Sequence, residues 1–140
     1  MKRSELQEFA QGAGADLLGV ADIGRFAGLP ERLRPETIFP ETKSVVVIGR
    51  RVTRGTLRGV EEGTNFGNYA MYGYDWLDNR FLSLTTFRIS EFLEDRGWEA
   101  VPLPNLPPEV PPMGVAVAPG RPEPNVMLDF ADAAVRAGLG

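Results

Sequence analysis

Proline is concentrated in one stretch of this chain: nine of its twelve prolines lie in the segment 102–125. Proline fixes its own φ angle and has no backbone N–H, so this segment cannot form a regular helix or a central strand. We predict an extended arm with a short strand at Val115–Ala118, which covers the domain or wraps a second copy. The run Pro107–Pro112 favours polyproline II geometry, so a ligand for a proline-binding module is the alternative.

The rest of the chain shows helix and strand patterns in turn. The run Ser44–Gly49 is continuously apolar and β-branched, which predicts a strand buried on both faces. Other strands are predicted at Leu17–Ile23 and Trp98–Leu103. Helices are predicted from a capping box at Ser4 to Gly12, from Pro35, over Asp75–Arg96 with Gly97 as its C-terminal stop, and from an Asn125 cap to Val135. These patterns indicate an α/β (α+β) fold over residues 1–140, a single domain with a small mixed sheet packed by helices.

Cysteine and histidine are both absent. Their absence excludes disulfides, zinc–thiolate sites and thiolate-ligated iron–sulfur clusters within this chain, and no metal site is predicted. Acid–base chemistry therefore falls to Asp, Glu, Tyr, Lys or a bound cofactor. The net charge of −4 disfavours a general nucleic-acid binder. No apolar run approaches the roughly 20 residues of a membrane span and no secretory signal is present, so we expect a cytoplasmic protein without a membrane partner.

Four arginines follow the strand predicted at 44–49 within nine residues. Ligands of α/β sheets bind at strand ends, and the guanidinium fork suits phosphate or carboxylate. The cluster therefore predicts a binding site for a cofactor phosphate, although no Walker or GxGxxG pattern is present. The alternative is a solvated loop whose arginines pair with Glu61 and Glu62. The candidate cofactor-binding arginines are Arg50, Arg54 and Arg58, and the fourth is Arg51.

The segment Gly63–Trp76 contains five aromatic residues and three glycines. Glycine allows the backbone to approach a flat ligand, and aromatic rings supply stacking faces and phenolic donors. Candidate catalytic residues here are Tyr72, Tyr74 and Asp75, and candidate cofactor-binding residues are Asn65 and Asn68. The alternative makes Asp75 a helix N-cap and the aromatic residues core or dimer contacts.

Arg88 falls within the apolar arc of the predicted helix 75–96. A charge in such a place needs a partner, and Glu91 lies three positions further along the chain. We predict a structural Arg88–Glu91 pair, with an anion site as the alternative.

Three segments in order, GADLLGVA (14–21), FPETKSVVV (39–47) and AGLG (137–140), resemble the N-terminal region of epoxyqueuosine reductase-like iron–sulfur proteins. That family is related to the corrinoid-dependent reductive dehalogenases. The resemblance implies a cobalamin-binding domain akin to flavin nitroreductase folds, followed by a ferredoxin-like module that carries 4Fe-4S clusters. It also implies an aspartate that gives a proton, which Asp75 matches best, with Tyr72 and Tyr74 nearby.

The segment 63–78 departs from the family pattern, since Trp76 and Leu77 follow Asp75 and no histidine is present. The tRNA substrate of epoxyqueuosine reductase is therefore not expected to carry over, and the negative charge does not favour it. The family's cysteines lie beyond its AGLG segment. We thus expect a cofactor-domain portion that is inactive alone, with corrinoid or flavin as candidate cofactors and clusters only in a longer form.

Two other functions stay open. One is a non-catalytic binding or dimerisation module, and the other is an anion- or nucleotide-binding domain that uses Arg50–Arg58. An unfinished sheet edge tends to pair with another chain, so we also predict a homodimer or a strand-exchanged oligomer.

Overall fold

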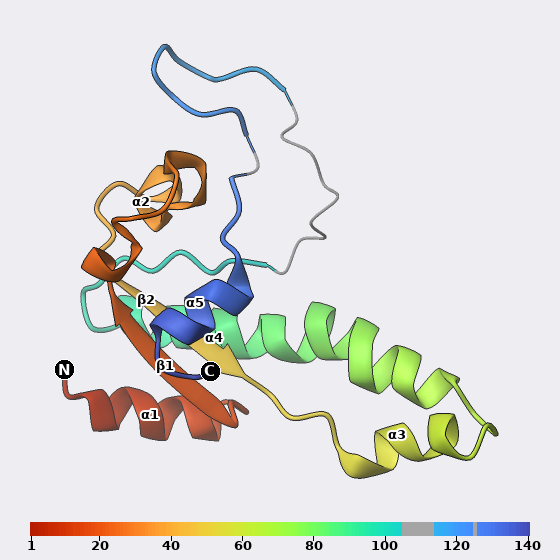
Figure 1. The fold of residues 1–140 in the computed structure, drawn as a ribbon. Coiled ribbons are helices and arrows are strands. Elements are labelled where there is room, and N and C mark those ends of the chain that lie inside the picture. Colours follow the sequence, from red (N-terminus) through yellow and green to blue (C-terminus); the bar gives the residue numbers. More distant parts are fainter. Residues whose placement is uncertain (105–113, 125) are drawn as a thin grey trace. The chain divides into compact units, whose positions relative to one another are not determined.

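The computed structural model describes residues 1–104, 114–124 and 126–140. The chain divides into two compact units: Met1–Leu18 with Ile48–Pro104, and Gly19–Val47 with Asn105–Gly140. Strands β1 (Leu17–Asp22) and β2 (Ser44–Gly49) lie side by side and form a two-stranded sheet (Figure 1).

The sheet is antiparallel, as its flanking hydrogen bonds demonstrate. At one end the Asp16 N–H donates to the Gly49 carbonyl (2.9 Å), and at the other the Ile23 N–H donates to the Lys43 carbonyl (3.0 Å). Together with the helices, this small sheet places the protein in the α+β class. No helix in the described part of the chain is long and apolar enough to cross a membrane.

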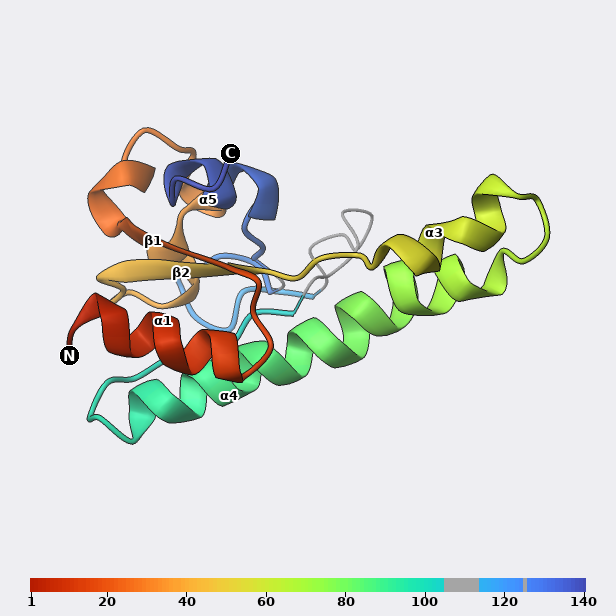
Figure 2. The same ribbon diagram turned by 90° about the horizontal axis from the view of Figure 1, so that it is seen from below.

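The first unit is built on helices α1 (Arg3–Gly12), α3 (Arg54–Glu61) and one long helix. The long helix is π-helical over Tyr69–Asp75 and Leu77–Leu82 and α-helical in α4 (Ser83–Glu94). Helix α1 packs on α4, where the Phe9 and Phe92 rings stack with centroids 4.2 Å apart. Helix α3 packs on the start of the long helix (Figure 2). We call residues 54–75 the helical hairpin.

The second unit has a small core of Ala21, Phe26, Ala133 and Ala137. Around it lie two 3₁₀ turns (Ile23–Phe26 and Glu31–Leu33) and the helices α2 (Pro35–Ile38) and α5 (Phe130–Arg136). Arg25 and Arg136 each donate a side-chain hydrogen bond to the other's backbone carbonyl, which ties α5 to the turn after β1.

Several sequence predictions are confirmed. Both strands occur where their apolar runs predicted, α1 stops at Gly12, and Pro35 opens α2. Gly97 adopts a φ of +85° just after α4, and the Trp98 N–H donates to the Leu93 carbonyl, so the helix ends in the glycine-dependent turn that the sequence predicted.

The predicted helix starts are wrong in three places. Lys2, not Ser4, caps α1, because its backbone N–H donates to Glu5 (3.0 Å). The long helix begins before Asp75, so this residue lies inside it and does not cap it. Helix α5 is capped by Asp129, whose carboxylate accepts from the Asp132 N–H (3.0 Å), whereas the predicted cap Asn125 lies outside the described residues.

The predicted strands and burial are also wrong in part. The residues of β2 are exposed or half-buried, because a two-stranded sheet does not supply cover for both faces. Trp98–Leu103 forms no strand, since it has no pairing partner and contains Pro102. Val115 and Val117 are 85% and 86% exposed and lie in no strand. The prediction for Pro107–Pro112 falls outside the described residues.

Candidate functional site

Two of the predicted cofactor-binding arginines are engaged on α3. The Arg54 Nη1 lies 2.7 Å from the Glu61 Oε2, and the Arg58 Nη2 lies 2.8 Å from the Glu62 Oε1. This is the pairing that the alternative interpretation expected, but on a helix and not in a loop. All four side chains are exposed, so each pair contributes only about 0–1 kcal/mol to stability.

Arg50 differs from the other three arginines of its cluster. Arg51 lies near Asp16, with its Nε 3.9 Å from the Asp16 Oδ1, whereas Arg50 forms no ion pair with any described residue. Its guanidinium lies over the Phe81 ring, 5.3 Å from the centroid. A Cβ on Gly14, where φ is +106°, would lie 3.0 Å from the Arg50 Nη1, so glycine provides the room that the guanidinium occupies. Arg50 thus presents an uncommitted cation just after β2.

A row of aromatic rings runs along the long helix from Tyr72 towards Arg50. The Tyr72 and Trp76 rings meet edge to face at 5.6 Å, and Trp76 and Phe81 do so at 6.4 Å. In a π-helix hydrogen bonds join residues five apart, so rings spaced four and five positions apart lie along one face. With Arg50 over Phe81, these contacts join a predicted catalytic residue to a predicted cofactor-binding residue. We call Tyr72, Trp76, Phe81 and Arg50 the aromatic ladder.

Sequence reasoning missed the two middle rings of this ladder. Trp76 was expected to make core or dimer contacts, and Phe81 belongs to the apolar arc of the predicted helix 75–96; both are half-buried. The Arg80 guanidinium lies 4.6 Å from the Trp76 centroid and adds a second cation to the ladder. The four- and five-residue spacing of the rings is the signal that would have pointed to them.

The remaining predicted site residues have local roles or stand in solvent. Asp75 accepts a hydrogen bond from the Asn79 Nδ2 (2.9 Å) one turn later. Asn65 accepts from the backbone N–H groups of Gly67 (2.9 Å) and Asn68 (3.3 Å) and so shapes the turn that opens the long helix. Tyr74 is 66% exposed. The structure brings Tyr72 and Arg50 into one ladder and does not bring these residues to it.

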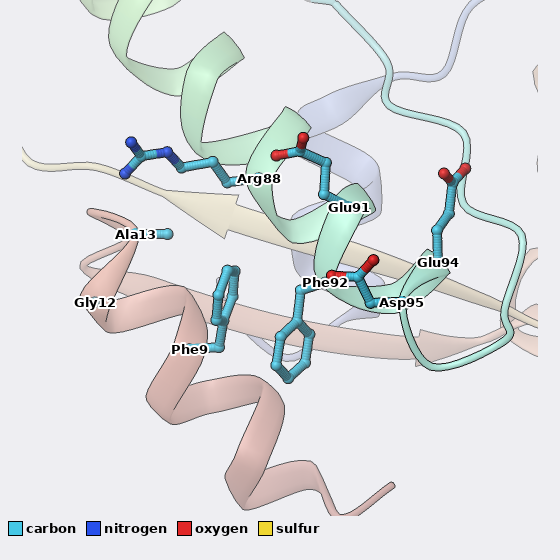
Figure 3. Close-up of a pocket in the computed structure, with 8 residues that line it drawn as sticks. All are labelled: Phe9, Gly12, Ala13, Arg88, Glu91, Phe92, Glu94 and Asp95. Atoms are coloured by element: carbon cyan, nitrogen blue, oxygen red, sulfur yellow. The ribbon is translucent and has the colours of Figure 1, made fainter.

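An open hollow of about 730 Å³ lies between α1 and α4 (Figure 3). The stacked rings of Phe9 and Phe92 line it, together with Arg88 and acidic side chains of α4. The predicted Arg88–Glu91 pair is wrong: Arg88 is exposed, and it forms no ion pair with Glu91 or another described residue. In Figure 3 the Arg88 side chain extends away from the Glu91 carboxylate. The full lining is Phe9, Gly12, Ala13, Arg88, Glu91, Phe92, Glu94 and Asp95.

Within residues 1–104, 114–124 and 126–140, no three acidic side chains come close enough together to hold a metal ion. Comparisons of this chain with protein-family models, with curated proteins and with solved structures find no match.

Proposed function

We propose that this chain is the cofactor-binding portion of an iron–sulfur oxidoreductase resembling epoxyqueuosine reductase, with cluster ligands outside this chain. The observation that carries the proposal is the aromatic ladder. It joins Tyr72, a candidate proton donor, to Arg50, an uncommitted cation, through ring contacts of 5.3–6.4 Å. Ring faces beside a guanidinium suit a flat ring system that carries a phosphate or carboxylate, and both flavin nucleotides and corrinoids have this chemistry.

The placement of the segments that carry the resemblance supports the same proposal. In the second unit, a Cβ on Gly19 would lie 2.8 Å from the Ala137 Cβ and 2.9 Å from the Leu139 Cγ. Two of the three resembling segments therefore pack directly against each other. The third contains most of β2, which pairs with β1.

The roles of the individual residues follow from their surroundings. Arg50 would hold the anionic group of the cofactor, since its charge is not taken up by a described carboxylate. Trp76 and Phe81 would pack against the ring system, and bound flavin or corrinoid would supply the electron-transfer chemistry. Tyr72 is 48% exposed and Asp75 is also exposed, so either side chain can exchange a proton with solvent or with a substrate. π-Helical turns such as the one that holds them occur frequently at functional sites.

The test is a binding titration with flavin mononucleotide and, separately, with hydroxocobalamin, followed by equilibrium dialysis and by the absorption spectrum of the ligand. In a Trp98→Phe background Trp76 is the sole tryptophan, and its fluorescence reports directly on the ladder. We expect at least one ligand to bind and to quench the fluorescence of Trp76. Arg50→Gln should weaken binding at least tenfold, while Arg54→Gln, which removes an arginine already paired with Glu61, should not.

Absence of binding by both ligands, or equal losses from the two arginine variants, would refute the proposal. If inorganic phosphate binds with the same dependence on Arg50 but neither cofactor does, the chain is an anion-binding domain. That is the second candidate function, and the uncommitted Arg50 is the observation that favours it.

The same chain is proposed to self-associate. Each strand of the sheet pairs with one neighbour among the described residues and so offers an unpaired edge. Such edges template pairing with a second chain. This edge is the reason for proposing a homodimer or a strand-exchanged oligomer. It also supports the alternative function, a non-catalytic dimerisation module.

A further inference from the structure

The helical hairpin is well defined internally yet strongly exposed. Thr56 and Gly59 are both buried: a Cβ on Gly73 of the long helix would lie 3.3 Å from the Thr56 Cγ2, and a Cβ on Gly59 would lie 2.2 Å from the Asn65 carbonyl oxygen. Nevertheless, every residue from Glu61 to Tyr72 is exposed. The hairpin is therefore a closely packed element with large apolar side chains facing water.

Besides Tyr72 of the aromatic ladder, which is 48% exposed, five large apolar residues of the hairpin are exposed by 36–66%. The group consists of Val60, Phe66, Tyr69, Met71 and Tyr74. An aromatic side chain carries about 200 Å² of surface, so the three aromatic residues alone leave roughly 350 Å² in water. A standard interface buries about 800 Å² on each partner. The valine, the methionine and the stems of the charged side chains on α3 add to the aromatic contribution, so the hairpin approaches the area that a stable dimer needs.

The charges on the hairpin favour a second copy over a strongly charged partner. Arg54 is paired with Glu61 and Arg58 with Glu62, so the surface has no unbalanced block of one sign. Two identical hairpins can therefore approach without like-charge repulsion, although the whole chain carries a net charge of −4. In a two-fold dimer one patch supplies both halves of the interface, which is the commonest symmetry of soluble oligomers.

We propose that a second copy of this chain docks on the helical hairpin, with Val60, Phe66, Tyr69, Met71 and Tyr74 of each copy forming the centre of a two-fold interface. The paired charges of α3 form its rim and contribute more to orientation than to affinity. This interface differs from pairing of the sheet edges. It does not depend on the cofactor proposal, since it uses neither Arg50 nor the rings of Trp76 and Phe81.

The first test is sedimentation equilibrium of the full chain without any cofactor. We expect a concentration-dependent dimer, which Phe66→Asp weakens at least tenfold. Phe87→Asp is the matched control, because Phe87 is a similarly exposed phenylalanine (52% against 64%) on α4, outside the hairpin. Both sites are exposed, so both variants should fold, and circular dichroism verifies this.

The second test uses the absence of cysteine from the chain. A single cysteine at Ala70, which is exposed on the hairpin, should cross-link two copies efficiently with a short bismaleimide. A single cysteine at Gln7, which is exposed on α1, should not. A wild-type chain that stays monomeric at several hundred micromolar would overturn the proposal. So would a dimer that survives Phe66→Asp, as strand exchange predicts, or one that both aspartate variants weaken equally.

Discussion

The helical hairpin and the core of the second unit use the same residue types in opposite ways. Phe26 is 1% exposed in a core that it shares with Ala133 and Ala137, whereas Phe66 is 64% exposed in the hairpin. In the core, packing within the chain explains each residue. In the hairpin, packing within the chain does not explain the aromatic residues, because their side chains are exposed and not buried. The core therefore maintains the fold, whereas the exposed side chains of the hairpin are the reason for proposing that a second copy of the chain docks there.

The largest expected effect tests this contrast directly. Phe26→Ala should destabilise the protein by about 3–5 kcal/mol, since it leaves a cavity in a small core. Phe66→Ala should change the free energy of unfolding of the monomer by less than about 0.5 kcal/mol. Urea unfolding at a concentration well below any dimer dissociation constant measures both. Equal effects would show that the hairpin is stabilised as the core is.

A smaller effect separates two glycines of helix α3 that have different neighbours. Gly59→Ala should cost about 1–3 kcal/mol, because the new Cβ would lie 2.2 Å from the Asn65 carbonyl oxygen and the turn must shift. Gly55→Ala in the same helix meets no atom within 4 Å and should stabilise it by about 0.5 kcal/mol. Thermal unfolding of the two variants gives the comparison. If Gly59→Ala leaves the stability unchanged, the turn at Asn65 can shift at little cost and the hairpin is not closely packed there.

The smallest effect concerns the ends of the helices. Asp129→Ala removes the carboxylate that accepts from the Asp132 N–H and should cost about 1 kcal/mol, with Asp129→Asn losing much less. Helix α3 has no such side-chain cap at Thr53. Thr53→Asp should therefore stabilise α3 by a few tenths of a kcal/mol, a small net gain because the substitution also removes the Thr53–Thr56 hydroxyl contact (2.7 Å). Chemical denaturation of each variant measures these changes in the free energy of unfolding. An Asp129→Ala variant as stable as the wild type would contradict the prediction.

The candidate site was predictable only in part. The arginine cluster and the aromatic segment were both visible as compositional features, and Arg50 and Tyr72 lie in one ladder. The sequence did not show which arginines of the cluster form ion pairs and which one does not. Arg54 and Arg58 became engaged because residues 54–61 form a helix that brings Glu61 and Glu62 within reach, and a sequence rich in glycine and arginine gave no clear helical period there.

Local sequence alone determined the elements whose signals act over a few residues. The β-branched run of β2, the stop at Gly12, the start of α2 at Pro35 and the left-handed turn at Gly97 depend on backbone and side-chain preferences that need no distant partner. Tertiary structure decided the rest. Whether Trp98–Leu103 pairs as a strand and how deeply β2 is buried depend on groups far away in the sequence. Which arginine stays uncommitted depends both on the helix that pairs Arg54 and Arg58 with nearby glutamates and on the distant Asp16 beside Arg51. Hydrogen bonds and ion pairs form only where the fold brings both partners together.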